Sequence, residues 1–239
     1  NVAALARISA ETGVHVIAGT GHYREPFLDR EWIDRHSVDE VADSLVRDLT
    51  EGFPGTGVRA GIIGEIASNA WYMTSAEERS FRAAARAQLR TGARISTHAT
   101  DWPTGLAQLR LLGEEGVAPE DVIIGHVDTV PDPDYPLRLA EAGAWVQLDT
   151  FFHCKAGGAI VPGPFAHRVA VLRRLIDAGH AGRVLLSHDV CVPALLARNG
   201  GTGYTFLLQE GREALIDAGI EAEFIDAALT ANVGRALSS

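Results

Sequence analysis

Four residues of types that bind metal ions lie at the ends of four short apolar segments of this sequence. They are Glu65, His98, His126 and Asp189. Each segment has the length and β-branched composition of a strand buried on both faces of a parallel sheet. A carboxylate is costly to bury there unless a cation or hydrogen bonds compensate for it. Two imidazoles and two carboxylates suit zinc, manganese, cobalt or iron, so we expect a divalent-metal site.

Taken singly, a histidine at a strand end is more often a hydrogen-bonded structural residue than a ligand. Four such strand ends in one chain favour the metal-binding interpretation. His188 directly precedes Asp189. Because neighbouring residues of a strand point to opposite faces, we expect Asp189 rather than His188 to face the site.

Strands and helices are expected to alternate along the whole chain. Two helix starts carry a capping-box pattern, Ser37 with Glu40 and Thr74 with Glu77. The apolar patterns predict strands over residues 14–19, 58–66, 93–98, 122–126, 144–149 and 184–189. They predict helices over residues 2–12, 37–51, 74–90, 104–115, 133–142, 165–178, 206–218 and 220–237.

This alternation indicates parallel βαβ units in a single α/β domain over residues 1–239. An open doubly wound sheet also alternates, but it gathers its ligands around one switch point. Ligands at four strand ends suit a (β/α)8 TIM barrel, in which those ends converge on one mouth. The expected strands correspond to strands three to eight. We therefore expect the first two βα units, about 60 residues at ~30 per unit, to be missing from the front.

Composition narrows the functional classes. The net charge of −10 argues against binding to nucleic acid or to an anionic membrane surface. The two cysteines, Cys154 and Cys191, are too few for a disulfide framework and are expected to be packing residues or pocket-wall thiols. No apolar run approaches the 18 residues of a membrane span. We expect a cytoplasmic protein.

Six segments taken in order resemble the phosphotriesterase-like family of the amidohydrolase superfamily. They read AGTGHY, RAGIIGEI, ISTHA, IIGHVDT, QLDT and LSHDVC. The resemblance implies a (β/α)8 barrel with two divalent metal ions, expected to be zinc, and a bridging hydroxide. It implies that Glu65 bridges the metals and that His98 and His126 hold the more exposed one. Asp189 would bind the other metal and take the proton from the attacking water.

Two departures from the family pattern matter. The organophosphate hydrolases of the family bridge their metals with a carboxylated lysine, whereas Glu65 resembles the subgroup called phosphotriesterase homology proteins. The His-x-His pair of the family's first strand has no counterpart in this sequence. The residues given therefore supply one complete metal site and half of the second. Lactonases of the family carry an arginine after the seventh-strand aspartate, where Asp149 is followed here by Thr150.

Substrate contacts are expected from the loops that follow the strands. The candidates are Tyr23, Trp71, Trp102, the 151–164 loop with Phe151 and Phe152, and the segment that begins at Cys191. Tyr23 could hydrogen-bond the substrate or the hydroxide, or could be an ordinary surface tyrosine. Asp128 and Asp149 could be proton relays behind the metal ligands or helix N-caps.

The sequence thus predicts a metal-dependent hydrolase of small-molecule ester-type substrates: phosphoesters, carboxylic esters or lactones. Two neighbouring cations would bring the pKa of a bridging water towards neutrality, and a carboxylate could accept the released proton. The alternatives are a lactonase and a catalytically silent barrel with a binding or structural role. A homodimer is possible. A His-x-His pair upstream of Asn1 in the reading frame would favour the enzyme over the silent barrel.

Overall fold

The computed structural model describes residues 1–156 and 159–238. The chain divides into two compact units. The first comprises residues 1–99 and 104–123 with the chain from Leu237 on, and the second comprises residues 100–103 and 124–236. The boundary falls within one strand, β4 (Val122–Gly125). The expectation of a single domain stays a prediction.

The first unit is a parallel sheet covered by helices. Its strand order is β1-β2-β3-β4, with β1 parallel to β2 and β2 parallel to β3. The strands that precede β4 are β1 (Gly19–Thr20), β2 (Ile62–Ser68) and β3 (Ile95–Ala99). Its helices are α1 (Val2–Thr12), α2 (Arg30–Arg35), α3 (Val38–Thr50), α4 (Ser75–Thr91) and α5 (Gly105–Glu114), with short 3-10 turns at Glu25–Phe27 and Pro119–Asp121.

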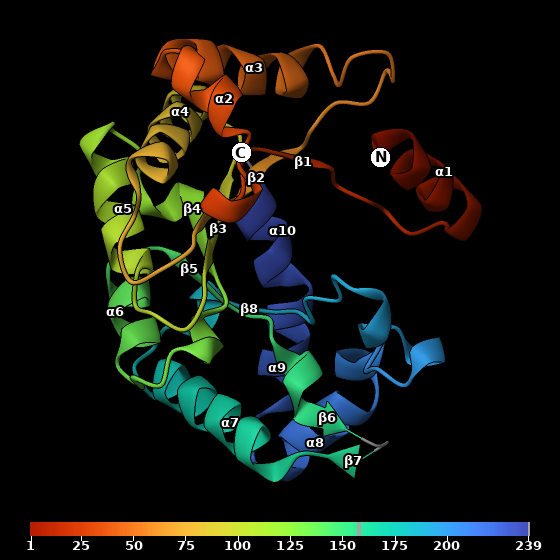
Figure 1. The fold of residues 1–239 in the computed structure, drawn as a ribbon. Coiled ribbons are helices and arrows are strands. Elements are labelled where there is room, and N and C mark those ends of the chain that lie inside the picture. Colours follow the sequence, from red (N-terminus) through yellow and green to blue (C-terminus); the bar gives the residue numbers. More distant parts are fainter. Residues whose placement is uncertain (157–158, 239) are drawn as a thin grey trace. The chain divides into compact units, whose positions relative to one another are not determined.

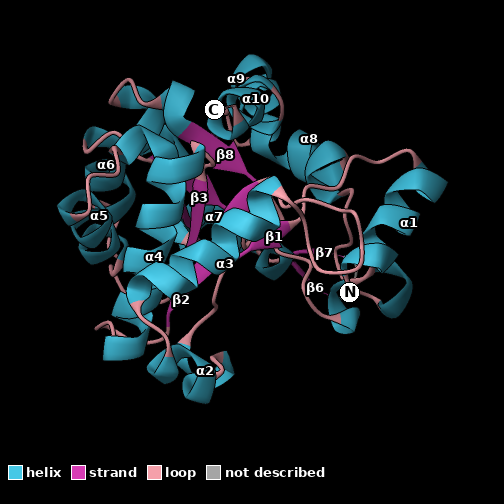
Figure 2. Ribbon diagram, turned by 90° about the horizontal axis from the view of Figure 1, so that it is seen from above, coloured by secondary structure: helices cyan, strands magenta, loops and turns pink. Residues whose placement is uncertain are grey.

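Capping residues determine where the two longest helices of this unit begin. Both predicted capping boxes are present, at the starts of α3 and α4. These helices lie side by side, and α4 also packs on β2 and β3 (Figures 1 and 2). One buried cluster joins Val41 and Ala42 of α3, Ala76 and Ala83 of α4 and Ile33 of α2. This packing holds α4 on the strands that carry Glu65 and His98.

The start of the first unit differs from the prediction. The strand expected over residues 14–19 is wrong except for Gly19, because the sheet begins only there. Val14, Val16 and Ile17 are exposed. β-Branched residues favour a strand only when a neighbour covers and pairs with them, and no described strand of the first unit pairs with residues 14–17. The segment 24–35, for which the sequence predicts neither a strand nor a helix, contains α2 and a 3-10 turn.

Strand β2 carries an irregularity directly before Glu65. Its register against β3 shifts between Ile63 and Ile66, which is the mark of a β-bulge. Gly64 lies in the bulge with a φ of 137°, and a Cβ there would meet the carbonyl oxygen of Ser96 at 2.3 Å. A Cβ on Gly19 would in turn meet the Gly64 carbonyl oxygen at 2.0 Å. Two glycines therefore allow the backbone to place Glu65 where it lies.

In the second unit, the strand β5 (Trp145–Leu148) lies between β4 and β8 (Val184–Leu186). Strands β5 and β8 are parallel. A small antiparallel pair, β6 (Lys155–Ala156) with β7 (Ala159–Ile160), forms a separate sheet. The α-helices are α6 (Tyr135–Glu141), α7 (Pro162–Asp177), α8 (Glu210–Asp217), α9 (Ala222–Leu229) and α10 (Ala231–Leu237). The 3-10 turns are Val127–Thr129, Phe151–Cys154, Ala181–Arg183, Pro193–Leu195, Ala197–Asn199 and Phe206–Leu208.

Two predicted elements of this unit are wrong in extent. The strand expected over 184–189 ends at Leu186, so strand alternation does not decide where His188 and Asp189 point. The helix expected over 220–237 is two helices, separated at Thr230. Both differences lie at the ends of regular elements, where local apolar patterns carry little information about the backbone.

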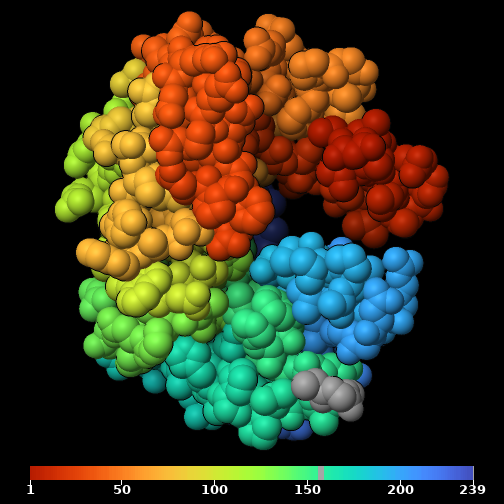
Figure 3. Space-filling view, viewed as in Figure 1, coloured from red at the N-terminus to blue at the C-terminus, as the bar shows by residue number. Residues whose placement is uncertain are grey.

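A long irregular segment follows β8, as the sequence predicts. It contains three of the 3-10 turns and lies on the surface of the second unit (Figure 3, light blue). Val192, Tyr204 and Leu208 are exposed along it. Gly201 permits a tight turn, because a Cβ there would lie 2.3 Å from the Leu195 backbone.

Among the described residues, no helix has the length and apolar character needed to cross a membrane.

The bulge leads to a stability prediction. We expect Gly64→Ala to lower the free energy of unfolding by about 1–3 kcal/mol, because the new Cβ meets backbone atoms at a positive φ. The matched control is Gly113→Ala in α5, where a Cβ would have no neighbour within 4 Å. This control should gain about 0.5–1 kcal/mol from helix propensity. Urea unfolding of both variants measures the difference, and a Gly64→Ala protein as stable as the control would contradict the steric argument.

Candidate functional site

Three predicted site residues meet in the first unit. Glu65 lies in the β2 bulge, and His98 is the fourth residue of β3. Oε2 of Glu65 is 3.3 Å from Nδ1 of His98, and the phenol oxygen of Tyr23 is 3.1 Å from the same nitrogen. The Tyr23 ring also meets the His98 ring edge-on at 4.9 Å. Tyr23 is therefore a partner of a predicted ligand rather than an isolated surface side chain.

A buried glutamine ties the ends of these strands together. Nε2 of Gln108, on α5, donates to the carbonyl oxygen of His98 and to Oγ of Ser68, both at 2.9 Å. Ser68 is the last residue of β2. The backbone at the end of β3 is thus fixed by a helix side chain as well as by the sheet.

In the second unit, His126 is held by a buried carboxylate. It follows β4 with a φ of 58°, in the left-handed region. Its Nδ1 lies 2.6 Å from Oδ1 of Asp149, and its backbone N–H lies 3.2 Å from both carboxylate oxygens. An ionised carboxylate can only accept, so we assign the proton of the ring contact to Nδ1 of His126. Gln147 also donates to Asp149, at 2.5 Å. Burial raises the pKa of Asp149, and the hydrogen bond from His126 opposes this rise.

Asp128 lies behind this pair and is fully buried. Its Oδ1 accepts the Asp149 backbone N–H, and its Oδ2 accepts both the N–H and the hydroxyl of Thr150. Nε of Arg168, from α7, is 2.7 Å from the same Oδ2. The N-cap alternative for Asp128 is wrong, because Asp134 occupies that position at α6. Asp149 is likewise no N-cap, since its carboxylate serves His126.

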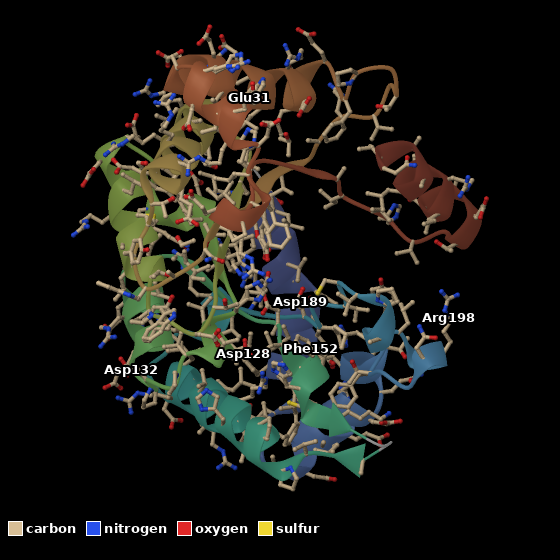
Figure 4. All side chains as sticks on the ribbon, viewed as in Figure 1. Glu31, Asp128, Asp132, Phe152, Asp189 and Arg198 are labelled. Atoms are coloured by element: carbon tan, nitrogen blue, oxygen red, sulfur yellow. The ribbon has the colours of Figure 1, made fainter. Side chains whose placement is uncertain are left out.

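Asp189 lies three residues beyond the end of β8, with a φ of 49°. Its carbonyl oxygen accepts the Cys191 backbone N–H at 2.9 Å. Burial and the neighbouring Asp189 carboxylate raise the pKa of the Cys191 thiol. Nε2 of His188 accepts the Leu207 backbone N–H at 2.9 Å, so His188 anchors the segment after β8. Figure 4 shows Asp189 well apart from Arg198, which lies at the outer end of that segment.

The predicted substrate-contacting aromatic residues differ in exposure. Trp71 and Trp102 are exposed, and Phe152 is half-buried and packs on His153 with ring centroids 4.0 Å apart. Phe151 is fully buried, with the Arg168 guanidinium over its ring. A substrate would have to displace this packing to reach Phe151, so Phe152 is the better candidate of the two. Residues 157 and 158 of the predicted 151–164 loop lie outside the described residues.

The two cysteines have different surroundings. Cys154 is buried, and burial raises the pKa of its thiol to about 11. This agrees with the packing role expected from the sequence. Cys191 is exposed and remains a predicted substrate contact.

Sequence reasoning missed Arg168 and Gln108. Arg168 interrupts an apolar helix face formed by Phe165, Val169, Leu172 and Leu175, all of which the structure buries to the same side. An arginine at such a position requires a buried acidic partner, which is a signal readable from the pattern. Gln108 carries no comparable signal, because a glutamine in a helix is ordinarily exposed.

The comparisons with known proteins agree with this arrangement of elements. The model of the phosphotriesterase family matches residues 1–237. The chain belongs to the phosphotriesterase family. The phosphotriesterase homology protein of Escherichia coli is 37% identical over 225 residues, which cover 94% of this chain and 75% of that protein. Its crystal structure, with phosphate in the active site, superposes with a TM-score of 0.92 over the whole of this chain and 80% of that one.

Two further relatives are named for other activities. An N-acetyltaurine hydrolase of Danio rerio is 30% identical over 100% of this chain and 69% of its own length. A lactonase of Listeria monocytogenes superposes with a TM-score of 0.91 at 25% identity, over 100% of this chain and 77% of that one. The α/β barrel class expected from the sequence is therefore confirmed, and the chain is a member of a hydrolase family.

A half-buried histidine next to Tyr23 makes the stability depend on pH. His22 stacks on Trp32 with ring centroids 5.3 Å apart. Burial lowers the pKa of His22, and the carboxylates of Asp48 and Asp29 offset part of this effect. The unfolded chain, with a histidine pKa near 6.5, therefore binds a proton that the folded chain excludes. The contribution to stability is intact above that pKa and is lost as the pH falls through the lower, folded-state value.

We therefore expect the free energy of unfolding to fall between pH 7.5 and pH 5.5, and to fall less in His22→Gln. Replacing His15, an exposed histidine of the same unit, by glutamine provides the control and should leave the fall unchanged. Urea unfolding at the two pH values gives both differences. An equal fall in wild type and His22→Gln would contradict the assignment.

Proposed function

We propose that this protein is a metal-dependent hydrolase of small ester-type substrates. Glu65, His98 and His126 would hold a divalent cation, and Asp189 would contribute to a second cation and accept a proton. The observation that carries the proposal is the contact of His126 Nδ1–H with Asp149 at 2.6 Å. A carboxylate on one ring nitrogen fixes the tautomer of a histidine so that the other nitrogen, Nε2, can bind a metal.

The donor chemistry fits zinc or a similar ion. Glu65 and His98 bring a carboxylate oxygen and an imidazole nitrogen within 3.3 Å of each other. Oxygen and nitrogen donors of this kind suit zinc, cobalt, manganese and iron. The family resemblance of the sequence, with two cations, supports the same set of residues. The identity and number of the metal ions are part of the proposal.

The cations would supply Lewis acidity: they would polarise the oxygen of the bond under attack and make water nucleophilic near neutral pH. The protein's own groups would do the rest. His126 is oriented by Asp149, and His98 is oriented by Tyr23 and Glu65. Asp189 would take the proton from the attacking water as a general base. Phe152, Trp102 and the segment after Cys191 would contact the substrate.

The ester class is favoured by the family and by one relative. The Escherichia coli protein binds phosphate in its active site, which is the oxyanion a phosphoester releases. The Listeria relative is a lactonase, and the Danio relative hydrolyses the amide N-acetyltaurine. All three bonds join an electrophilic centre to a leaving group that water replaces. Phosphoesters, carboxylic esters, lactones and N-acetyltaurine therefore form the panel that decides the substrate class.

A hydrolysis screen of this panel with the zinc-, manganese- and cobalt-loaded protein tests the proposal. We expect turnover of at least one ester class. We expect Glu65→Gln to bind less metal and to be at least ~100-fold less active, as for removal of a large electrostatic contribution. Glu31→Gln, at an exposed position of α2 (Figure 4), is the control. Turnover by Glu65→Gln equal to the control, with full metal content, would remove Glu65 from the site. Hydrolysis of N-acetyltaurine alone would replace the ester assignment by an amide one.

A second experiment separates the histidines from Asp189. Replacing His98 or His126 by Ala should raise the dissociation constant for zinc, so excess zinc should restore part of the activity by mass action. Asp189→Asn keeps an oxygen donor but cannot accept a proton. Its turnover should fall ~100 to 10,000-fold, as for a lost general base, and added zinc should not restore it.

Turnover measured against zinc concentration for the three variants gives this comparison. If zinc restored Asp189→Asn as fully as His98→Ala, Asp189 would be a plain ligand. The proton would then have to leave through another group, such as Asp128.

A further inference from the structure

The second unit contains a buried arginine that the proposed reaction does not itself use. Arg168 lies in the middle of α7 with 4% of its side chain exposed. A buried arginine is rare unless it is paired, because the charged group must leave water. Its partner is Asp128, whose side chain is completely buried. The pair therefore has a specific position in the core of this unit rather than on its surface.

Arg168 makes more contacts than one ion pair requires. Its Nε lies 2.7 Å from Oδ2 of Asp128, and one terminal nitrogen donates to the Pro164 carbonyl oxygen at 2.9 Å. The other terminal nitrogen donates to the Thr150 carbonyl oxygen at 2.8 Å and to its hydroxyl. The planar guanidinium thus binds a carboxylate and a backbone segment at the same time. The smaller ammonium group of a lysine could not reach all of these acceptors at once.

These contacts continue to His126 through a short series of hydrogen bonds. Asp128, held by Arg168, accepts the backbone N–H groups of Asp149 and Thr150. This fixes the backbone from which the Asp149 carboxylate projects. That carboxylate accepts both the backbone N–H and Nδ1–H of His126. Each step is a hydrogen bond between buried groups, where little water competes.

We propose that Arg168 is a positioning residue that sets the ring orientation and the tautomer of His126. The guanidinium holds Asp128, Asp128 and Thr150 hold the backbone at Asp149, and Asp149 keeps the His126 proton on Nδ1. Nε2 is thereby kept as the nitrogen that binds the cation. This inference rests on the proposed function only for the identity of that cation ligand.

The test compares Arg168→Met and Arg168→Lys with wild type. Arg174→Met is the matched control, because Arg174 lies on the same helix but pairs with Asp134 at the surface. The first readout is nitrogen-15 NMR of the imidazole groups in the metal-free protein, with the His126 signals assigned by their absence in His126→Ala. The second readout is the zinc dissociation constant, and circular dichroism and thermal melting verify that each variant is folded.

We expect wild type and Arg174→Met to show His126 protonated at Nδ1. Arg168→Met should show a mixture of tautomers and bind zinc about 10–100-fold more weakly, as for the loss of a group that orients a metal-binding histidine. Arg168→Lys should be intermediate in both measurements, since lysine keeps the positive charge but lacks the planar guanidinium. A purely structural role for Arg168 would lower the melting temperature and leave the tautomer of His126 unchanged.

Folded Arg168 variants with the wild-type tautomer and a zinc affinity within about twofold of the control would overturn the proposal. Should Arg168→Met not fold, Arg168→Lys decides alone by the same two measurements. Failure of the proposed function looks different. If His126→Ala bound zinc as wild type does, while the tautomer still changed in Arg168→Met, the positioning would hold and His126 would not be a ligand.

Discussion

Burial of carboxylates is the constraint on which the arrangement around His126 depends. Asp128 and Asp149 lie within one hydrogen-bonded network, with 0% and 2% of their side chains exposed. Two anions so close in a low-dielectric core are unfavourable unless donors and a cation surround them. Arg168 supplies the cation, and backbone N–H groups, Thr150 and Gln147 supply the donors. The same groups that make burial tolerable also fix the direction of each side chain.

The other constraint is geometrical, because a regular strand does not place these side chains. Glu65 lies in a bulge, and His126 and Asp189 have φ values of 58° and 49°. Left-handed backbone at a residue other than glycine costs on the order of 1–2 kcal/mol and persists only where surrounding structure enforces it. For His126 the enforcing contact is visible, since its backbone N–H and ring both bind Asp149. Only His98 occupies a regular strand position.

The sequence predicts the frame of the fold better than the details that place the site. The capping boxes at Ser37 and Thr74 give correct helix starts, because they depend on residues three positions apart. The strand over residues 14–19 fails, because pairing depends on distant residues that a local pattern does not contain. The bulge at Gly64 and the C-terminal end of β8 are missed by the sequence patterns for the same reason. Each depends on the neighbouring strand or on the segment that follows.

The sequence therefore points to the candidate ligand residues but not to the groups that contact them. The position of each candidate ligand near the end of an apolar segment is read from the sequence, whereas the partner of each one follows from the folded chain. Tyr23 was expected on a loop facing substrate, and the structure places its hydroxyl 3.1 Å from His98. Asp149 was expected to be a relay or a cap, and it binds the ring of His126. Pairings of this kind join residues 75 and 23 positions apart, beyond the reach of any local pattern.

The two histidines are held in physically different ways. His98 meets Glu65, whose side chain is one-third exposed, and a tyrosine from a half-buried loop. His126 meets a carboxylate that is 2% exposed and is itself fixed by backbone N–H groups, Asp128 and Arg168. Water can compete for the first set of contacts but hardly for the second, so the orientation of His126 is set by folding. The orientation of His98 depends on partners that are themselves more open to water than those of His126.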